Sequence, residues 1–187
     1  MFIDVFQQRA INAAKASTQR WHQEVPLSPF DGIPYAVKDL LDVAGSRTTA
    51  GSITRMDAPM AVEDAAVIAA LTALGMIALG KTNLTEFAYS GLGLNPHFGT
   101  PTCDIPVGES RVPGGSSSGS AIAVQKGIVT SAIGTDTAGS IRIPAAFNGL
   151  VGYKASTARY SMNGVHQLAI TLDSLGGFAH TVADCVS

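Results

Sequence analysis

From position 128 to 147 the chain reads Ile128-Val129-Thr130-Ser131-Ala132-Ile133-Gly134-Thr135-Asp136-Thr137-Ala138-Gly139-Ser140-Ile141-Arg142-Ile143-Pro144-Ala145-Ala146-Phe147. The short apolar run at 128–133 is bounded by turn-forming residues, which predicts a buried strand. Small and polar residues at 134–140 predict a turn, and a short helix is expected near 143–147. This stretch therefore predicts a strand, a tight turn and a helix in succession.

Further elements are expected on both sides of this stretch. Helices are predicted at 3–23, 63–74, 83–89 and 121–126, with a last helical turn at 182–185 that Thr181 caps. Strands are predicted at 35–37, 76–79 and 150–153. Gly75 is expected to end the helix at 63–74. One face of this helix is small and apolar and consists of Ala66, Ala69, Ala70, Ala73 and Leu74. Strands that alternate with helices predict an α/β fold with a largely parallel sheet flanked by helices.

Length and composition limit the class of protein. A chain of 187 residues predicts a single domain over 1–187. The net charge is −2 and Lys and Arg form no cluster, so neither nucleic acid nor a membrane surface is expected as a direct ligand. Cys103 and Cys185 belong to no Cys-x-x-Cys pair, and the N-terminus lacks the pattern of a secretory signal. We therefore expect a cytoplasmic protein.

A second Gly/Ser turn precedes the helix at 121–126. It reads Pro113-Gly114-Gly115-Ser116-Ser117-Ser118-Gly119-Ser120. A turn at a helix N-terminus presents unpaired backbone N–H groups. Acyl-transfer enzymes use such groups to hold the oxyanion that forms when a serine attacks a carbonyl. The two turns together therefore predict nucleophilic serine chemistry.

A serine hydroxyl needs a base, and the chain offers one better candidate than histidine. The four histidines, His22, His97, His166 and His180, are scattered along the chain without a useful spacing. Lys38 directly follows an apolar strand, where burial would favour the neutral amine. A neutral amine accepts a proton, which an exposed lysine with a pKa of about 10.4 does poorly. Lys38 is therefore the favoured base.

Taken together, these segments resemble the amidase-signature family. Two glycine- and serine-rich segments resemble the halves of the family signature: Gly114-Gly115-Ser116-Ser117-Ser118-Gly119-Ser120-Ala121 and Gly134–Ala145. Supporting pieces are Gly32-Ile33-Pro34-Tyr35-Ala36-Val37-Lys38-Asp39, Gly80-Lys81-Thr82-Asn83 with Glu86-Phe87-Ala88, and Gly149–Lys154. The resemblance covers about residues 28 to 185. It implies the amidase-signature fold, a mixed and largely parallel sheet, in an N-terminal portion of about half the usual family length.

The resemblance also implies roles for individual residues. Ser140 would be the nucleophile, Lys38 the base, and Ser116 a bridging serine preceded by a cis peptide bond. The backbone N–H groups expected in the oxyanion hole are those of Thr137, Ala138, Gly139 and Ser140. Ala88 and Ser116 are expected to contact a small-molecule amide substrate. No metal or organic cofactor is implied.

The implied reaction is hydrolysis of a carboxamide C–N bond through an acyl-enzyme. An alternative within the family is the A-type subunit of the tRNA-dependent amidotransferase, which uses the same triad on glutamine and passes ammonia to a partner subunit. Another alternative is a truncated remnant without catalytic activity. The state of assembly stays open between a homodimer and a complex with a partner subunit.

Two further motif matches lack the expected structural context. Gly75–Thr82 fits the phosphate-binding loop pattern, but an expected helix precedes it and its interior reads as an apolar strand. Gly115–Gly119 fits the nucleophile elbow of α/β-hydrolases, but residues 104–114 read as loop where the elbow needs a strand. We therefore expect neither a nucleotide site nor an elbow.

Overall fold

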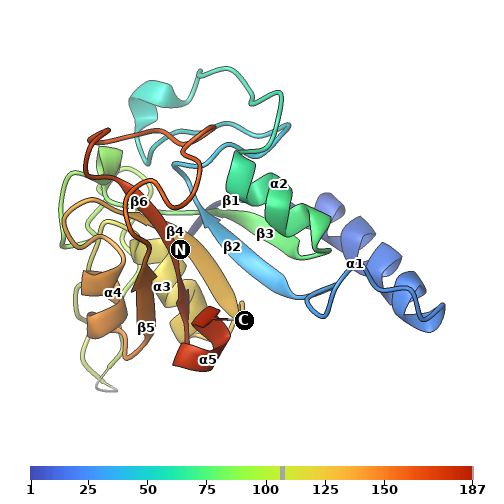
Figure 1. The fold of residues 1–187 in the computed structure, drawn as a ribbon. Helices are drawn as coiled ribbons and strands as arrows, with labels where there is room; N and C mark the ends of the chain where they lie inside the picture. The colour runs from blue at the N-terminus through green and yellow to red at the C-terminus, as the bar shows by residue number, and fades with distance from the viewer. Residues whose placement is uncertain (106–107, 187) are drawn as a thin grey trace.

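The computed structural model describes residues 1–105 and 108–186, which form a six-stranded sheet in the order β1-β3-β2-β4-β6-β5 (Figure 1). The strands are β1 (Phe2–Val5), β2 (Pro34–Lys38), β3 (Ile77–Thr82), β4 (Ser131–Asp136), β5 (Val151–Lys154) and β6 (Ser174–Ala179). β2 lies between β3 and β4 and is parallel to both. β1 is antiparallel to β3, and β6 is antiparallel to both β4 and β5. Strands β2, β3, β4 and β5 therefore share one direction, and the predicted α/β fold with a mixed, largely parallel sheet is confirmed.

Helices pack on both faces of this sheet and divide the core in two. They are α1 (Gln7–His22), α2 (Ala66–Ala73), α3 (Ser118–Gln125), α4 (Arg142–Phe147) and α5 (Val182–Val186), with 3-10 turns η1 (Ile53–Arg55) and η2 (Glu86–Ala88). α3 packs across β2, β4 and β6, whereas α2 packs on β3. Consecutive side chains of a strand point to opposite faces. Accordingly Tyr35 of β2 belongs to the core cluster that includes Ile68 of α2, and Ala36 belongs to the cluster that includes Ala121 of α3.

The first predicted helix begins later than expected, and two strands, β1 and β6, were not predicted. Residues 2–5 form β1, in which Phe2 pairs with Thr82 of β3, so the helix at 3–23 is wrong over its first residues. Pairing along the edge of β3 outweighs a local sequence pattern that suits a helix. β6 was missed because Gly176 and Gly177 in its interior are residues that weaken an isolated strand.

The second helix buries a different face from the small apolar one seen in the sequence. α2 begins at Ala66 rather than at 63, and its buried residue is Ile68. Ala69, Ala70, Ala73 and Leu74 face solvent instead. Ile68 with its larger side chain removes more apolar area from water than an alanine does, so it determines which face packs. The predicted end of the helix is confirmed, since Gly75 follows with a φ of 85°.

The C-terminal helix α5 agrees with the helical turn predicted at 182–185. Thr181 caps α5, and its hydroxyl oxygen accepts from the Asp184 N–H at 3.1 Å. Of the helices in residues 1–105 and 108–186, none has the length and apolar character needed to cross a lipid bilayer.

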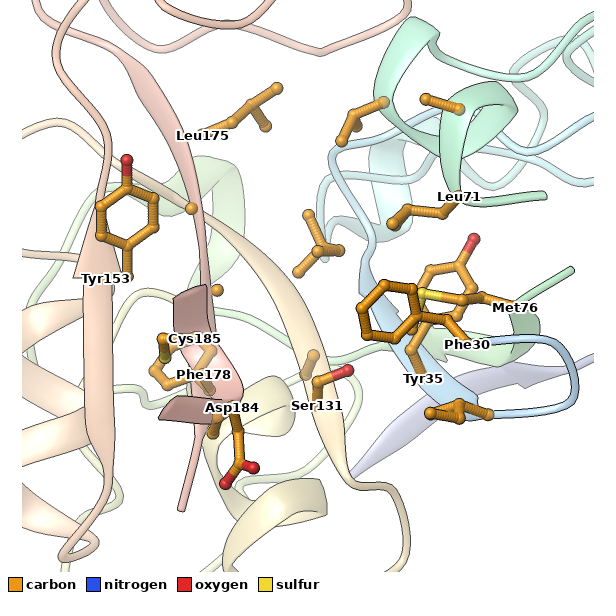
Figure 2. A pocket seen from close by; sticks show the side chains of 18 of the residues that line it. Phe30, Tyr35, Leu71, Met76, Ser131, Tyr153, Leu175, Phe178, Asp184 and Cys185 are labelled. Carbon is orange, nitrogen blue, oxygen red and sulfur yellow. The ribbon is translucent and has the colours of Figure 1, made fainter. Parts of the chain in front are cut away.

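A groove of about 780 Å³ lies on the sheet face that carries α2 (Figure 2). Figure 2 shows Phe30, Tyr35, Leu71 and Met76 on one side of it and Tyr153 and Leu175 on the other. The exposed residues Ala70 and Leu74 of α2 also line it. The groove is therefore largely apolar and extends over β2, β4 and β6, with Asp184 and Cys185 of α5 also among its lining residues.

Candidate active site

Lys38 and the turn that contains Ser140 lie at the same edge of the sheet. β2 ends at Lys38 and β4 ends at Asp136, and because these two strands are parallel neighbours, their carboxyl ends meet. The second Gly/Ser turn opens α3, which packs across both strands. The topology therefore brings together three segments that are far apart in sequence.

Lys38 is fully buried and contacts two hydroxyl groups. Its Nζ donates to Ser116 Oγ at 2.7 Å and to Thr135 Oγ1 at 2.8 Å. Burial lowers the pKa of Lys38 to about 7, and the negative charges of Asp136 and Asp173 oppose that shift. Since an ammonium is costly to bury without a carboxylate in contact, the amine is partly neutral near pH 7.

Ser116 is held by its backbone on both sides. The Gly115–Ser116 peptide bond is cis, as the resemblance implies. The Ser116 carbonyl accepts from the Thr85 N–H at 3.1 Å, and the Gly115 N–H donates to the Gly91 carbonyl at 2.8 Å. A Cβ atom at residue 115 would lie 2.6 Å from the Gly93 nitrogen, so only glycine fits there. These contacts join the turn to residues 85–93.

Ser140 lies in a turn that the Asp136 carboxylate organises. Asp136 accepts from the backbone N–H groups of Gly139, Ile141 and Arg142 at 2.8, 3.1 and 3.3 Å. The Arg142 guanidinium also binds both carboxylate oxygens, at 3.0 and 3.1 Å. Burial raises the pKa of Asp136, but the hydrogen bonds from Arg142 and the backbone outweigh it and hold the pKa below its usual value. Asp136 thus stays ionised and fixes the turn from inside.

Ser140 is the most accessible of the three predicted catalytic residues. Ser140 is 9% exposed, whereas Lys38 and Ser116 are 0% exposed. Its carbonyl accepts from the Ser117 N–H at 3.2 Å, which joins the two turns. Among the described residues no hydrogen bond links the Ser116 and Ser140 hydroxyls. The structure therefore bonds Lys38 directly to Ser116 and ties Ser140 to the same turn through its backbone.

Three of the four predicted oxyanion donors, Ala138, Gly139 and Ser140, fall into two groups. The Gly139 N–H donates to Asp136 and is therefore already engaged, contrary to the expectation for this group. The N–H groups of Ala138 and Ser140 have no acceptor within the described part of the chain. Gly139 adopts a φ of 124°, while Ala138 stays outside the left-handed region, so a methyl group is tolerated at 138. The turn keeps free N–H groups at Ala138 and Ser140.

Ala88 lies in η2, where the backbone is left-handed at two consecutive residues. Phe87 and Ala88 have φ values of 49° and 61°. Ala88 is buried, and its N–H donates to the Thr85 carbonyl at 2.7 Å. Because the Thr85 N–H binds the Ser116 carbonyl, this unusual turn is connected to the predicted bridging serine.

Sequence reasoning missed two residues that the fold brings to this edge. Thr135 binds the Lys38 amine, and Asp173 accepts from the Thr137 hydroxyl at 2.5 Å. Thr135 lies in the Gly134–Ala145 segment, but the sequence analysis gave it no role. No motif around Asp173 indicates that it belongs to a site. Only the order of strands β2, β4 and β6 places these side chains beside Lys38 and the turn.

The secondary structure bears on both alternative motifs, one of which, Gly115–Gly119, contains Ser116 of this site. Gly75–Thr82 contains β3 and follows α2, and no strand occurs in the described residues of 104–114, so neither alternative motif has its required context. In residues 1–105 and 108–186, no three His, Cys, Asp or Glu side chains are grouped to hold a metal ion. Cys103 and Cys185 are free thiols.

The chain matches a known protein family along its whole length. The family model described as Amidase matches residues 1–187. The chain is 42% identical over 186 residues to the A-type subunit of a glutamyl-tRNA(Gln) amidotransferase from Cupriavidus necator, covering 98% of this chain and 36% of that protein. It is 40% identical over 176 residues to a 2-amino-5-chloromuconic acid deaminase from Comamonas testosteroni, covering 94% of this chain and 38% of that protein.

Solved structures share the fold closely. A peptide amidase from Stenotrophomonas maltophilia superposes with a TM-score of 0.85 at 34% identity, covering 94% of this chain and 36% of that chain. A vestigial protein complex related to the origins of an s-triazine catabolic enzyme gives a TM-score of 0.94 at 37% identity, covering 98% of this chain and 40% of that chain. The chain thus spans little more than a third of the length of the curated relatives it matches. With the family model matched over all 187 residues, the chain belongs to the amidase family, whose members carry the amidase signature.

Proposed function

We propose that this chain carries the reaction centre of an amidase that hydrolyses a carboxamide C–N bond through an acyl-enzyme. The observation that carries the proposal is the 2.7 Å contact between the buried Lys38 amine and the Ser116 hydroxyl. A lysine whose pKa is lowered to about 7 is partly neutral at physiological pH and can act as a general base. No metal or organic cofactor is part of this mechanism.

In the proposed reaction Ser140 Oγ attacks the carbonyl carbon of the substrate. Its proton passes to Ser116 Oγ as the Ser116 proton passes to the Lys38 amine, which becomes an ammonium. The free N–H groups of Ala138 and Ser140 would stabilise the oxyanion, with the Thr137 N–H as a third donor. The C–N bond breaks as the same relay returns a proton to the leaving nitrogen. Water then attacks the acyl-enzyme, releases the carboxylic acid and restores Ser140.

We place the acyl part of the substrate against residues 86–92, which include Ala88. The support is the pair of backbone hydrogen bonds that joins Thr85 to Ser116 and Gly91 to Gly115. These bonds would hold residues 86–92 at a fixed distance from Ser116, the proposed bridging serine. The free cysteines suit a reducing compartment, and we propose the cytoplasm as the location.

A second candidate function is that of the A-type subunit of an amidotransferase. The 42% identity to this subunit of a glutamyl-tRNA(Gln) amidotransferase, over 98% of this chain, favours it. In that case the longer protein would work with a partner subunit rather than alone or as a homodimer. Hydrolysis of glutamine in preference to simple carboxamides would favour this candidate.

The first experiment asks whether Ser140 reacts as a nucleophile. The purified chain is treated with a fluorophosphonate, whose phosphorus bonds to the serine oxygen as fluoride leaves, and the adduct is located by peptide mass spectrometry. We expect labelling at Ser140, none in Ser140→Ala, and a rate at least about 100-fold lower in Lys38→Ala.

Ser117→Ala is the matched control, because this neighbouring serine occupies the same turn without contacting Lys38. It should label at the rate of the unaltered chain if it folds equally well by circular dichroism. Adducts at Ser117 would support the nucleophile elbow instead, and a folded chain without any adduct would indicate an inactive remnant.

A further inference from the structure

Asp173 is a buried carboxylate directly ahead of β6, and the mechanism above gives it no role. It is 5% exposed. One oxygen accepts from the Thr137 hydroxyl at 2.5 Å, and the other accepts from the backbone N–H groups of Leu168 and Ala169 at 2.8 and 3.0 Å. Asp173 thus joins the loop before β6 to the first residue of the turn that contains Ser140.

The charge of Asp173 differs from the other charges near Lys38. Asp136 forms an ion pair with Arg142 at 3.0 Å, and Asp39 forms one with Lys81 at 2.8 Å. Asp173 has no cationic partner among the described residues, and only neutral donors bind it. Its negative charge nevertheless acts on Lys38 across the site. Of these three carboxylates, Asp173 is therefore the one whose negative charge has no ion-pair partner in the described residues.

The position of Asp173 follows from the sheet register. Asp136 at the end of β4 pairs with Ser174 at the start of β6. The Ser174 hydroxyl also donates to the Asp136 carbonyl at 3.0 Å. One residue beyond this pair, Thr137 and Asp173 face each other, so the ladder itself sets their contact.

We propose that Asp173 is a positioning residue of this site, which holds Thr137 at the start of the turn and places an uncompensated negative charge within range of Lys38. The inference rests on the proposed function, in which Lys38 is the base and the turn binds the oxyanion. The two contributions are separable, because one depends on the charge of Asp173 and the other on its hydrogen bond.

Two substitutions separate the charge from the hydrogen bond. Asp173→Asn keeps the size of the side chain but removes the charge, which leaves the Lys38 ammonium less stabilised. The midpoint of the Lys38 titration should therefore fall by about half a pH unit or more. Thr137→Val removes the hydroxyl donor but keeps the charge, so the midpoint should stay in place while the rate of Ser140 labelling falls about tenfold.

The test follows Lys38 directly by NMR, in chains labelled with ¹³C at the lysine Cε and titrated from pH 5 to 11. The Lys38 signal is assigned by its loss in Lys38→Met. Asp104→Asn is the control, since Asp104 is exposed and paired with Lys126 away from the site. We expect a lower midpoint in Asp173→Asn and an unchanged one in Asp104→Asn.

Equal midpoints in Asp173→Asn and the unaltered chain would overturn the inference, as would an equal shift in Asp104→Asn. If Asp173→Asn does not fold, Asp173→Glu and Thr137→Val take its place: both should keep a midpoint within the error of the unaltered chain, and a shift in either would overturn the inference. Because the NMR titration needs no turnover, a chain that fails to label at Ser140 refutes the proposed function without obscuring this result.

Discussion

Two buried lysines at neighbouring strand ends have different partners. Lys81 of β3 forms a fully buried ion pair with Asp39 at 2.8 Å and also donates to Thr48 at 3.1 Å. Within the described residues, Lys38 of β2 hydrogen-bonds only to hydroxyl groups, those of Ser116 and Thr135. A buried ammonium needs a paired anion to stay charged. This difference makes Lys38, and not Lys81, the lysine suited to exchange protons.

The lowered pKa of Lys38 predicts how labelling depends on pH. The neutral fraction of Lys38 rises as pH rises through about 7, so the rate of Ser140 labelling should increase with it. Below that value the rate should change about tenfold per pH unit, and above about pH 8 it should level off. Labelling rates measured from pH 5.5 to 9 test this.

Lys38→Arg is the control for this profile, because a guanidinium stays charged throughout the range. Its labelling should be slow at every pH. A profile for the unaltered chain that is flat, or that falls as pH rises, would contradict the assignment of Lys38 as the base.

The sequence predicted Lys38, Ser116 and Ser140 because each lies in a recognisable local motif. Thr135 and Asp173 could not be given roles in the same way, since their importance depends on which strands are neighbours. The hydrogen bond from the Gly139 N–H to Asp136 could not be predicted either, because it depends on the orientation of the Asp136 carboxylate in the folded chain. Local motifs predict the candidate reacting groups, whereas the groups proposed to orient them emerge only from the sheet order.

At the scale of elements, β5 and β6 approach each other unusually closely at one glycine. A Cβ atom at residue 176 would lie 1.9 Å from the Tyr153 carbonyl oxygen. At residue 177 the nearest atom would be the Ala132 carbonyl oxygen at 3.3 Å. Neither glycine has a positive φ, so the two positions differ in space and not in backbone conformation.

Gly176→Ala should therefore be much less stable than Gly177→Ala. The added methyl group must separate β6 from β5, at a cost of about 3 kcal/mol or more in the free energy of unfolding. Gly177→Ala requires only a small adjustment and should cost less than about 1 kcal/mol. Urea unfolding followed by circular dichroism measures both. Equal stabilities would show that the strands separate freely at this point.

Elements with strong local patterns were predicted, and those defined by their neighbours were not. The strand before Lys38 and the strand–turn–helix unit around Ser140 both have clear apolar runs and turn residues. β1 and β6 form because an edge of the sheet is available to each. Likewise, α2 is a helix by pattern, but its buried face depends on the strand beneath it.

At the scale of the whole molecule, the groove leaves apolar surface in contact with water. Ala70 and Leu74 of α2 line it and are exposed, Leu74 by 40%. Contiguous exposed apolar surface binds hydrophobic dyes. We expect the folded chain to enhance the fluorescence of anilinonaphthalene sulfonate, and we expect Ala70→Glu with Leu74→Glu to reduce this enhancement severalfold.

The melting temperature should change little in this double variant, because both side chains already face solvent. Val62→Glu is the matched control, since Val62 is 96% exposed and does not line the groove. It should leave the dye signal unchanged. A folded chain without dye enhancement, or an equal loss in the control, would show that the groove does not present a continuous apolar surface.

The strand order also determines when the sheet can be completed during synthesis. In the described part of the chain β5 pairs only with β6, which lies between β5 and β4. The ribosome therefore produces residues 151–154 before their partner exists, and β4 keeps an open edge until residues 174–179 emerge. Insertion of β6 then closes that edge, docks β5 and brings Asp173 to Thr137 in the same event. A nascent chain that stops before residue 174 lacks two strands rather than one, and it exposes the unpaired edge beside its candidate site to any other strand nearby.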